Sequence, residues 1–318
     1  MKKYASNGDR PSVLRRNQSK FPGACQEAIK QLQSATHPAR SGSNGLVALV
    51  MWMILGVIGV EQCHIAKAYP LPKKPSAGER WTKTILGVEY AFRWCPAGKF
   101  VMGSPDGEGY SGEKPLHLVA LTQGFWMLET EVTQEMWESV MGNNPSRFEE
   151  ANRPVERVSW NDCVRFCNKL SKESGLKIEL PTEAQWEYAC RARTTSTSSF
   201  GSTLNGDKAN CNGNQPFGTS KKGEYLGQTT VVKSYSPNAW GLYDMHGNVW
   251  EWCSDWYDYY DKSPTSDPKG PESSSEYARV CRGGCWSNGA TCCRSAYRYG
   301  LEPARSGTGI GFRPLSVP

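Results

Sequence analysis

Three cysteines lie close together near the end of the chain, in the stretch RGGCWSNGATCCRSAYR. Cys285, Cys292 and Cys293 alternate there with glycines, arginines and aromatic residues. Cysteine thiolates act as nucleophiles, as redox groups and as ligands of soft metal ions. In an exported protein the same residues can instead form structural disulfides, for which Cys253 and Cys281 are further candidate partners. The stretch therefore predicts either a thiol-based reaction centre or a set of disulfide partners.

The remaining cysteines have to be divided between packing and chemistry. Ten of the 12 cysteines follow residue 68: Cys95, Cys163, Cys167, Cys190, Cys211, Cys253, Cys281, Cys285, Cys292 and Cys293. Cys163 and Cys167 share with Phe166 and Leu170 the spacing of one helix face. We expect that face to be buried, which makes these two thiols packing residues.

Three segments have the apolar spacing and the end residues of helices. We expect helices at about 133–142, 160–172 and 183–192, preceded by the N-cap residues Thr133, Ser159 and Thr182. After residue 193, Gly, Asn, Ser and Thr dominate, which indicates loops and short strands. The chain holds 32 Gly, 20 Pro, 12 Trp and 14 Tyr, with only 38% hydrophobic residues. These features predict an α+β domain with little regular secondary structure and an aromatic core.

The N-terminal part differs from the rest in charge and hydrophobicity. Residues 1–68 carry nine basic and three acidic side chains, which account for the whole net charge of +6. The rest is neutral, so we expect no nucleic-acid partner. Residues 1–45 are expected to be a disordered basic leader. Residues 46–68 contain the apolar run LVALVMWMILGVIGV, which predicts a signal peptide or a signal anchor.

This organisation predicts an extracytoplasmic protein, either periplasmic or secreted. Its only membrane attachment would be residues 46–60, in the case that the segment is not cleaved. Residues 69–90 are expected to form a linker and an entry strand, and residues 91–316 the main domain.

A series of motifs in a fixed order runs through that main domain. They are FVMGS, EVTQEMW, PVERVSWNDCVRFC, LPTEAQWEYACRA, GLYDMHGNVWEWCSDWY, RGGCW, CRSAYR and GIGFRP. As a set they resemble the sulfatase-modifying-factor family, which includes the formylglycine-generating enzymes. The resemblance runs from about Arg93 to Pro314 and implies a domain with a C-type-lectin-like core. It also implies an activity, the dioxygen-dependent oxidation of a sulfatase cysteine to formylglycine, with Cu(I) held between two thiolates in the copper-dependent members.

The family's catalytic pair maps onto this chain with one departure. Counted from the Arg-Gly-Gly motif at 282–284, the second family cysteine falls on Cys293 and the first falls on Asn288. An amide cannot replace a thiolate as a Cu(I) ligand. Cys285 stands where the enzymes have a serine that lines the active site. The resemblance therefore implies Cys293, Cys285 and the neighbouring Trp250 as candidate catalytic residues. Cys285 and Cys293 would be the copper ligands, or alternatively would form a disulfide.

The resemblance also implies calcium sites. The family's ligands at the better matched site fall on the side chains of Asp244 and Glu251 and on the carbonyls of Gly247 and Val249. All four are oxygen donors, which Ca2+ prefers. A second site would begin with the side chain of Asn210 and the carbonyl of Cys211.

Two functions follow from these features. The first is a non-catalytic domain braced by calcium, whose loops bind a protein or peptide partner. The second is an oxidase of protein thiols related to formylglycine generation, for which the partner would be a sulfatase. Asn288 favours the first function, and the cysteines at 285 and 293 keep the second open.

Overall fold

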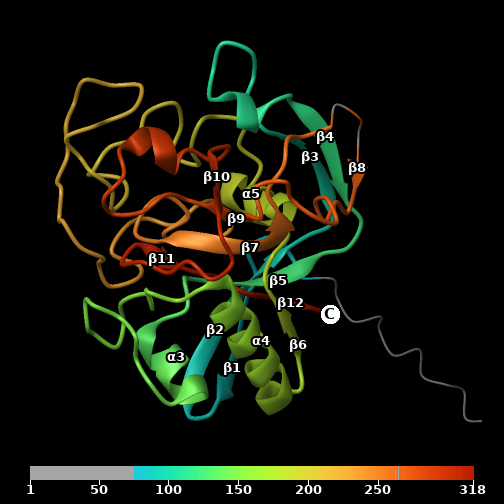
Figure 1. The fold of residues 1–318 in the computed structure, drawn as a ribbon, viewed down its shortest axis with the longest axis vertical. Helices are drawn as coiled ribbons and strands as arrows, with labels where there is room; N and C mark the ends of the chain where they lie inside the picture. The colour runs from blue at the N-terminus through green and yellow to red at the C-terminus, as the bar shows by residue number, and fades with distance from the viewer. Residues whose placement is uncertain (1–74, 262, 264) are drawn as a thin grey trace, which may run out of the picture. The chain divides into compact units, whose positions relative to one another are not determined.

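Three short β-sheets organise the described part of the chain, which comprises residues 75–318 without 262 and 264 in a computed structural model (Figure 1). The expected leader at 1–45 and signal segment at 46–68 lie outside the described residues. No helix among the described residues combines the length and the apolar character needed to cross a bilayer.

The largest sheet has five strands in the order β1-β2-β5-β12-β6. Its strands are β1 (Arg80–Ile85), β2 (Val88–Cys95), β5 (Phe125–Leu128), β12 (Leu315–Val317) and β6 (Lys177–Glu179). All neighbouring strands in it run antiparallel. β12 comes from the end of the chain and lies between β5 and β6, with Leu315 opposite both Met127 and Glu179. The last strand therefore joins segments that are distant in the sequence.

Two smaller sheets carry the loops of the second half. One has the order β10-β9-β7-β11, from Arg298–Leu301, Arg279–Arg282, Trp250–Trp256 and Ile310–Gly311. The other has the order β3-β4-β8, from Gly98–Met102, His117–Leu121 and Thr265–Ser266. Two short 3-10 helices, η1 (Ser111–Glu113) and η2 (Ala290–Cys293), complete the elements together with three α-helices.

The helices confirm the three segments expected from the sequence. They are α3 (Gln134–Met141), α4 (Trp160–Ser174) and α5 (Glu183–Arg191). Thr133, Ser159 and Thr182 each accept a hydrogen bond from a backbone N–H of the first turn, which satisfies a donor that the helix leaves open. α3 and α4 pack beside β1 and β2, whereas α5 contacts β3, β7 and β9 (Figure 1).

The core is aromatic, as the composition predicts. Fully buried rings include Trp186, Trp252, Phe92, Phe125 and Phe312. The expected stripe on α4 lies in this core, with Cys163 and Cys167 buried. The strands β6 to β12 of the second half are short, with at most seven residues each, in agreement with the expected α+β fold of low regularity.

The cysteines differ from one expectation. All ten cysteines of the described residues are free thiols, nine of them buried and Cys292 partly exposed. The disulfide partners expected among Cys253, Cys281, Cys285 and Cys293 are not joined in this structure. Burial explains why these residues suit the core without a bridge, since a free cysteine packs as a small hydrophobic side chain.

Candidate functional site

The candidate catalytic cysteines lie on a tight turn that follows β9. Gly283 and Gly284 have φ angles of 91° and 72°, a region that side chains disfavour. A Cβ atom at Gly284 would lie 2.6 Å from the sulfur of Cys293. The two glycines therefore let the chain turn back over η2, which carries Cys293 on its last residue.

Asn288 has a structural task in this turn. Its backbone N–H donates to the carbonyl of Cys285 at 3.0 Å, and its side-chain Oδ1 accepts from the backbone N–H of Cys285 at 3.2 Å. The thiol of Cys285 also donates to this Oδ1, at 3.0 Å. Burial raises the pKa of Cys285, so this thiol is protonated at neutral pH. The amide at the family's cysteine position thus closes the turn around Cys285.

The thiol that forms a hydrogen bond with Cys293 is not the expected one, Cys285. The side chain of Cys293 hydrogen-bonds to Cys211, and both residues are fully buried. This hydrogen bond and the burial hold the pKa of Cys293 well above its usual range, whereas the same bond lowers the pKa of Cys211. No hydrogen bond of the described residues joins the sulfurs of Cys285 and Cys293. Cys293 is therefore hydrogen-bonded to Cys211, and its interaction with Cys285 is electrostatic only.

These positions do not fit the copper site that the family implies. A two-coordinate Cu(I) site needs two thiolates that face each other, with access for a substrate thiol. Here the Cys285 thiol is engaged by Asn288 and Ser287, and Cys293 is sealed in the core. Burial keeps the Cys285 thiol neutral, and the hydrogen bond to Cys211 together with burial keeps the Cys293 thiol neutral, so we derive no step through copper.

Trp250, the third candidate catalytic residue, begins β7 and is almost fully buried. Its ring centroid lies 5.9 Å from that of Tyr297 and 5.7 Å from that of Tyr299. Tyr297 in turn lies edge-on to Tyr110 at 5.6 Å. Tyr110 and Tyr299 are exposed, so Trp250 forms the buried part of an aromatic row that reaches the surface.

The residues of the better matched calcium site surround the loop that precedes β7. Asp244 is buried, and its Oδ2 accepts the backbone N–H of Lys233 at 2.8 Å. Glu251 is buried and receives two hydrogen bonds on Oε2, from Trp186 at 2.7 Å and Arg313 at 3.0 Å. Burial raises the pKa of Asp244 to about 6.

The loop that precedes β7 contains buried backbone carbonyl oxygens. Gly247 and Val249 are buried, and among the described residues no hydrogen-bond donor reaches their carbonyls. Gly247 has a φ of 87°, and a Cβ atom there would lie 2.3 Å from the carbonyl oxygen of Asn210. Only glycine therefore allows the two predicted calcium-binding segments to touch.

The second segment has the same character. Asn210 is buried and its Oδ1 has no partner, while its Nδ2 donates to Asn248 Oδ1 at 3.1 Å. The carbonyl of Cys211 also accepts no bond from the described residues. Buried oxygens without donors are rare in proteins and are a sign of an absent cation or water. The open carbonyls and the Oδ1 of Asn210 therefore fit a hard cation such as Ca2+. Both oxygens of Glu251 already accept hydrogen bonds, Oε1 from Arg313 at 2.8 Å and Oε2 from Trp186 and Arg313.

Sequence reasoning missed Glu131, which lies near this loop. It is fully buried, and neither of its carboxylate oxygens has a hydrogen-bond partner. Burial, followed by the charges of Asp244 and Glu251, raises its pKa well above the usual range, and Arg313 opposes them. Three acids thus share one guanidinium. Among the described residues no three His, Cys, Asp or Glu side chains converge as metal ligands, so a cation here would depend on the carbonyls.

Comparison with known proteins agrees with the fold and with the family that the motifs indicate. A family profile described as a sulfatase-modifying factor enzyme 1-like domain matches residues 90–316. The formylglycine-generating enzyme of Streptomyces coelicolor is 34% identical over 281 residues, covering 69% of this chain and 86% of that enzyme.

Two solved structures share the fold. PvdO from Pseudomonas aeruginosa superposes with a TM-score of 0.65 at 27% identity, covering 77% of this chain and all of that one. Treponema denticola variable protein 1 gives 0.63 at 29% identity, covering 75% of this chain and 99% of that one. Together with the motifs and the C-type-lectin-like α+β architecture, these matches show that the chain belongs to the sulfatase-modifying-factor family.

Proposed function

We propose that this domain is a non-catalytic member of the family, braced by calcium, which binds a protein or peptide partner outside the cytoplasm. The observation that carries the proposal is the state of Cys293. The residue at the family's second cysteine position is a buried neutral thiol paired with Cys211, and the first position holds an amide that closes a turn. A thiol oxidase needs an accessible thiolate, which neither Cys285 nor Cys293 supplies.

Calcium would act as a brace in this proposal. The loop before β7 and the segment at Asn210 meet through the backbone bond from Asn248 to Asn210, 2.8 Å long. A divalent cation held by Asp244, Glu251 and the carbonyls of Gly247 and Val249 would offset the buried negative charge next to Glu131. Ca2+ would thereby stabilise the folded state.

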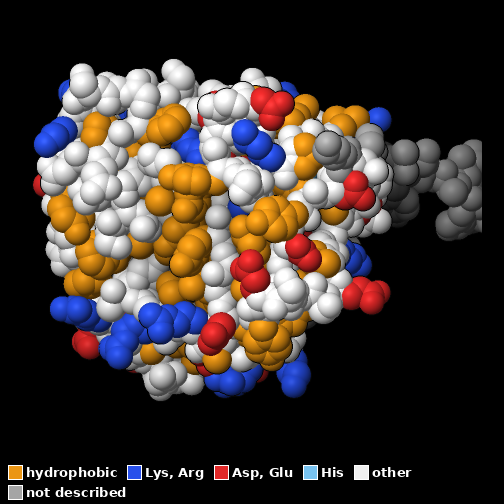
Figure 2. All heavy atoms as spheres, turned by 45° about the horizontal axis from the view of Figure 1, so that its top comes forward, with side chains coloured by type: hydrophobic (Ala, Val, Ile, Leu, Met, Phe, Trp, Pro, Cys, Tyr) orange, Lys and Arg blue, Asp and Glu red, His pale blue; other side chains and the backbone are white. Residues whose placement is uncertain are grey.

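The surface near Trp250 supports a partner site. The aromatic row of Tyr110, Tyr297, Trp250 and Tyr299 has exposed rings at both ends. Aromatic residues are enriched at the centres of protein interfaces. The face shown in Figure 2 carries a band of hydrophobic side chains bordered by charged ones. A peptide that lies along the aromatic row would combine apolar and polar contacts.

A peptide assay separates binding from catalysis. The full-length chain is loaded with Cu(I) under anaerobic conditions and then given oxygen and a peptide that carries the sulfatase motif Cys-x-Pro-x-Arg. We expect no loss of the peptide thiol by mass spectrometry. Formation of formylglycine that disappears in Cys293→Ser would refute the non-catalytic proposal and establish the oxidase, which the 34% identity to a formylglycine-generating enzyme favours.

Calcium binding is tested separately by thermal unfolding. We expect 1 mM CaCl2 to raise Tm over the value in EGTA, and Asp244→Asn to reduce that rise. Asp207→Asn is a matched control, because Asp207 is a partly exposed acid in an ion pair with Lys221. Equal responses of the wild type and Asp244→Asn would rule out the brace.

A further inference from the structure

A well-formed cavity of the described residues lies away from Cys285 and Cys293 and from the calcium segments. It has a volume of about 500 Å3 and lies where the ends of β3 and β7, the starts of β4 and α5, and β8 come together. Its walls include Met102, His117, Asp255, Tyr260 and Pro268. Small-molecule sites have volumes of about 300–1,000 Å3 with a few polar groups on apolar walls, and this cavity has both properties.

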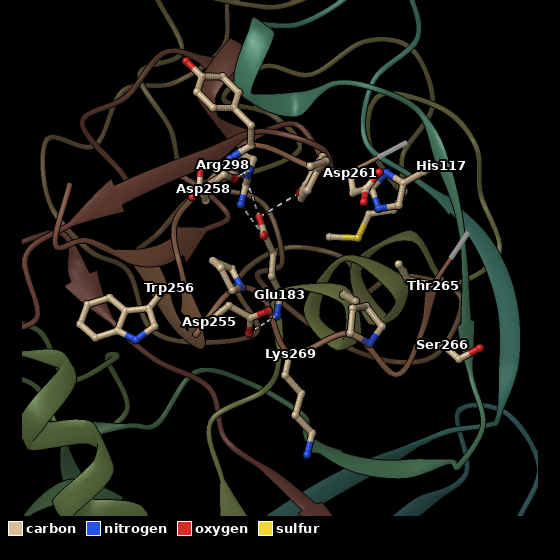
Figure 3. A pocket seen from close by; sticks show the side chains of 17 residues that line it. His117, Glu183, Asp255, Trp256, Asp258, Asp261, Thr265, Ser266, Lys269 and Arg298 are labelled. Atoms are coloured by element: carbon tan, nitrogen blue, oxygen red, sulfur yellow. Dashed lines mark hydrogen bonds and ion pairs between the residues drawn. The ribbon is translucent and has the colours of Figure 1, made fainter. Parts of the chain in front are cut away.

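Asp255 is a buried acid of this cavity to which no basic side chain of the described residues is hydrogen-bonded. It is 4% exposed, and its Oδ2 accepts the backbone N–H of Glu183 and the hydroxyl of Ser254, each at 2.9 Å. No donor among the described residues reaches its Oδ1. Figure 3 shows Asp255 beside Glu183 on one wall, with no basic side chain bonded to it.

The basic groups of the cavity are otherwise engaged. Arg298 binds both carboxylate oxygens of Glu183, at 2.6 and 2.7 Å, and donates to the backbone carbonyls of Gly112 and Asp258. Lys269 extends away from Asp255 and His117 (Figure 3). The cavity therefore contains a buried carboxylate to which neither of its basic lining residues is bonded, and the nearby Arg279 donates instead to the carbonyl of Ser254 at 2.7 Å.

The opposite wall offers a further acceptor. His117 projects from the start of β4 into the cavity (Figure 3). Its Nδ1 lies 2.9 Å from the carbonyl oxygen of Pro115, which makes Nδ1 the protonated nitrogen and leaves Nε2 as an acceptor. The first N–H of α5 is taken by Asp255, so the helix start offers that donor to no anion. An acceptor on each wall suits a ligand that carries N–H donors.

We propose that this cavity binds a small organic cation, an ammonium or guanidinium group on an apolar body, with the charged group against Asp255. The apolar body would lie on Met102 and on Pro268 and Pro271. The ligand would form a hydrogen-bonded ion pair with Asp255, an interaction that no basic side chain of the cavity makes. This inference concerns a different site from the proposed function and does not depend on it.

The pH dependence of binding follows from the groups around Asp255. Burial, and next the charge of Glu183, raise the pKa of Asp255 to about 7, and Arg298 opposes them. Arg279 of β9 also interacts with Asp255, and His117, Asp258, Asp261 and Lys269 line the same cavity. A cation should therefore bind more tightly as the pH rises through 7, where Asp255 ionises, while an alkylammonium ligand stays charged.

Three probes with one skeleton test the proposal by calorimetry on the full-length chain. They are 2-phenylethylamine, the neutral 2-phenylethanol and the anionic 3-phenylpropionate. We expect the amine to bind at pH 8 at least tenfold more tightly than the other two, and at least tenfold more tightly than at pH 5.5. Absence of amine binding at pH 8, or equal binding of the alcohol, overturns the proposal, as does preferred binding of the anion.

Asp255→Asn is the informative variant, because an amide oxygen can still accept the bond from the N–H of Glu183. We expect this variant to fold and to bind the amine at least tenfold more weakly at pH 8. Asp258→Asn is the matched control in the same cavity, and we expect less than a threefold change. Undiminished binding by Asp255→Asn refutes the assignment. If that variant fails to fold, the pH dependence of the wild type decides alone.

Discussion

Buried carboxylates in this molecule fall into two groups. Glu113, Glu183, Glu187 and Glu251 each bind a buried arginine, namely Arg294, Arg298, Arg282 and Arg313. Glu131, Asp244, Glu156 and Asp255 are also buried, but no arginine side chain of the described residues lies at hydrogen-bonding distance from them. The pKa of Glu113 and of Glu183 is lowered although burial opposes this, whereas burial raises the pKa of Glu131 and Asp255.

The carboxylates of the first group stabilise the fold through ion pairs with arginine. The carboxylates of the second group are buried without such an ion pair. The paired acids lie in η1, α5 and β7. They bind arginines of β9 and β10, the arginine that follows η2, and the arginine of the C-terminal segment. An unpaired buried acid lowers stability unless it is protonated or a cation arrives. Glu131 and Asp244 lie near the open carbonyls of the loop before β7, and Asp255 lines a cavity, so at these places a cation has room.

The largest loss of stability is expected when a paired acid loses its arginine. Arg282→Met removes the guanidinium that pairs with Glu187 and lies 3.4 Å from Glu183, and leaves buried charge behind. We expect the free energy of unfolding to fall by about 3–5 kcal/mol in urea titrations. A loss below about 1 kcal/mol would show that these carboxylates do not need their arginine, and the comparison would fail.

The next effect concerns Asp255 and the pH. Its pKa in the folded state is about 7, against 3.8 as the ordinary value, so between these limits the folded state holds the extra proton. Wild-type stability should therefore fall relative to Asp255→Asn as the pH rises from 4 to 7, by at most about 4 kcal/mol. Parallel stability profiles of the two proteins over this range would remove Asp255 from the unpaired group.

A smaller effect is expected for Glu131→Gln in EGTA. Burial raises the pKa of Glu131 well above its usual range, so the folded state favours the neutral form, which an amide provides without taking up a proton. We expect the variant to be more stable than the wild type by about 1–3 kcal/mol at pH 7, with a smaller gain at pH 4.5. Calcium should then stabilise it less than the wild type. A variant that is less stable at pH 7 in EGTA would show that the carboxylate has a partner.

The smallest loss of stability is expected for an exposed ion pair, which serves as the reference for the buried pairs. Arg165 and Asp162 form an ion pair on the surface of α4, with the Arg165 side chain 63% exposed. We expect Arg165→Met to change the free energy of unfolding by less than about 0.5 kcal/mol, because water screens such a pair. A loss comparable to that of Arg282→Met would mean that burial does not govern the strength of these pairs.

The helices and the family could be predicted from the sequence because their signals are local. Thr133, Ser159 and Thr182 mark helix starts by their side chains alone, and Gly142 ends α3 with a φ of 80°. The ordered motifs likewise indicate the fold without any knowledge of contacts. The three helices and the aromatic core accordingly lie where the sequence places them.

The candidate site could be predicted only in part, because its contacts join distant segments. Cys211 and Cys293 are far apart in the sequence, with β7, β8 and β9 between them. Nothing in the spacing of RGGCWSNGATCC indicates that their side chains form a hydrogen bond. Glu131 follows a strand in an ordinary ETEVT sequence, and only the fold reveals that both its oxygens lack donors. Asp255 reads in the sequence as one acid among several in SDWYDYYD, and the cavity beside it exists only after β7, β8 and α5 assemble.

The position of β12 between β5 and β6 has a consequence for biosynthesis. During translation, β5 and β6 are made long before Leu315, so the middle of the largest sheet stays open until β12 has been synthesised. The edges of β5 and β6 then offer unpaired N–H and C=O groups to other chains. Deletion of residues 315–317 would leave the same gap permanently.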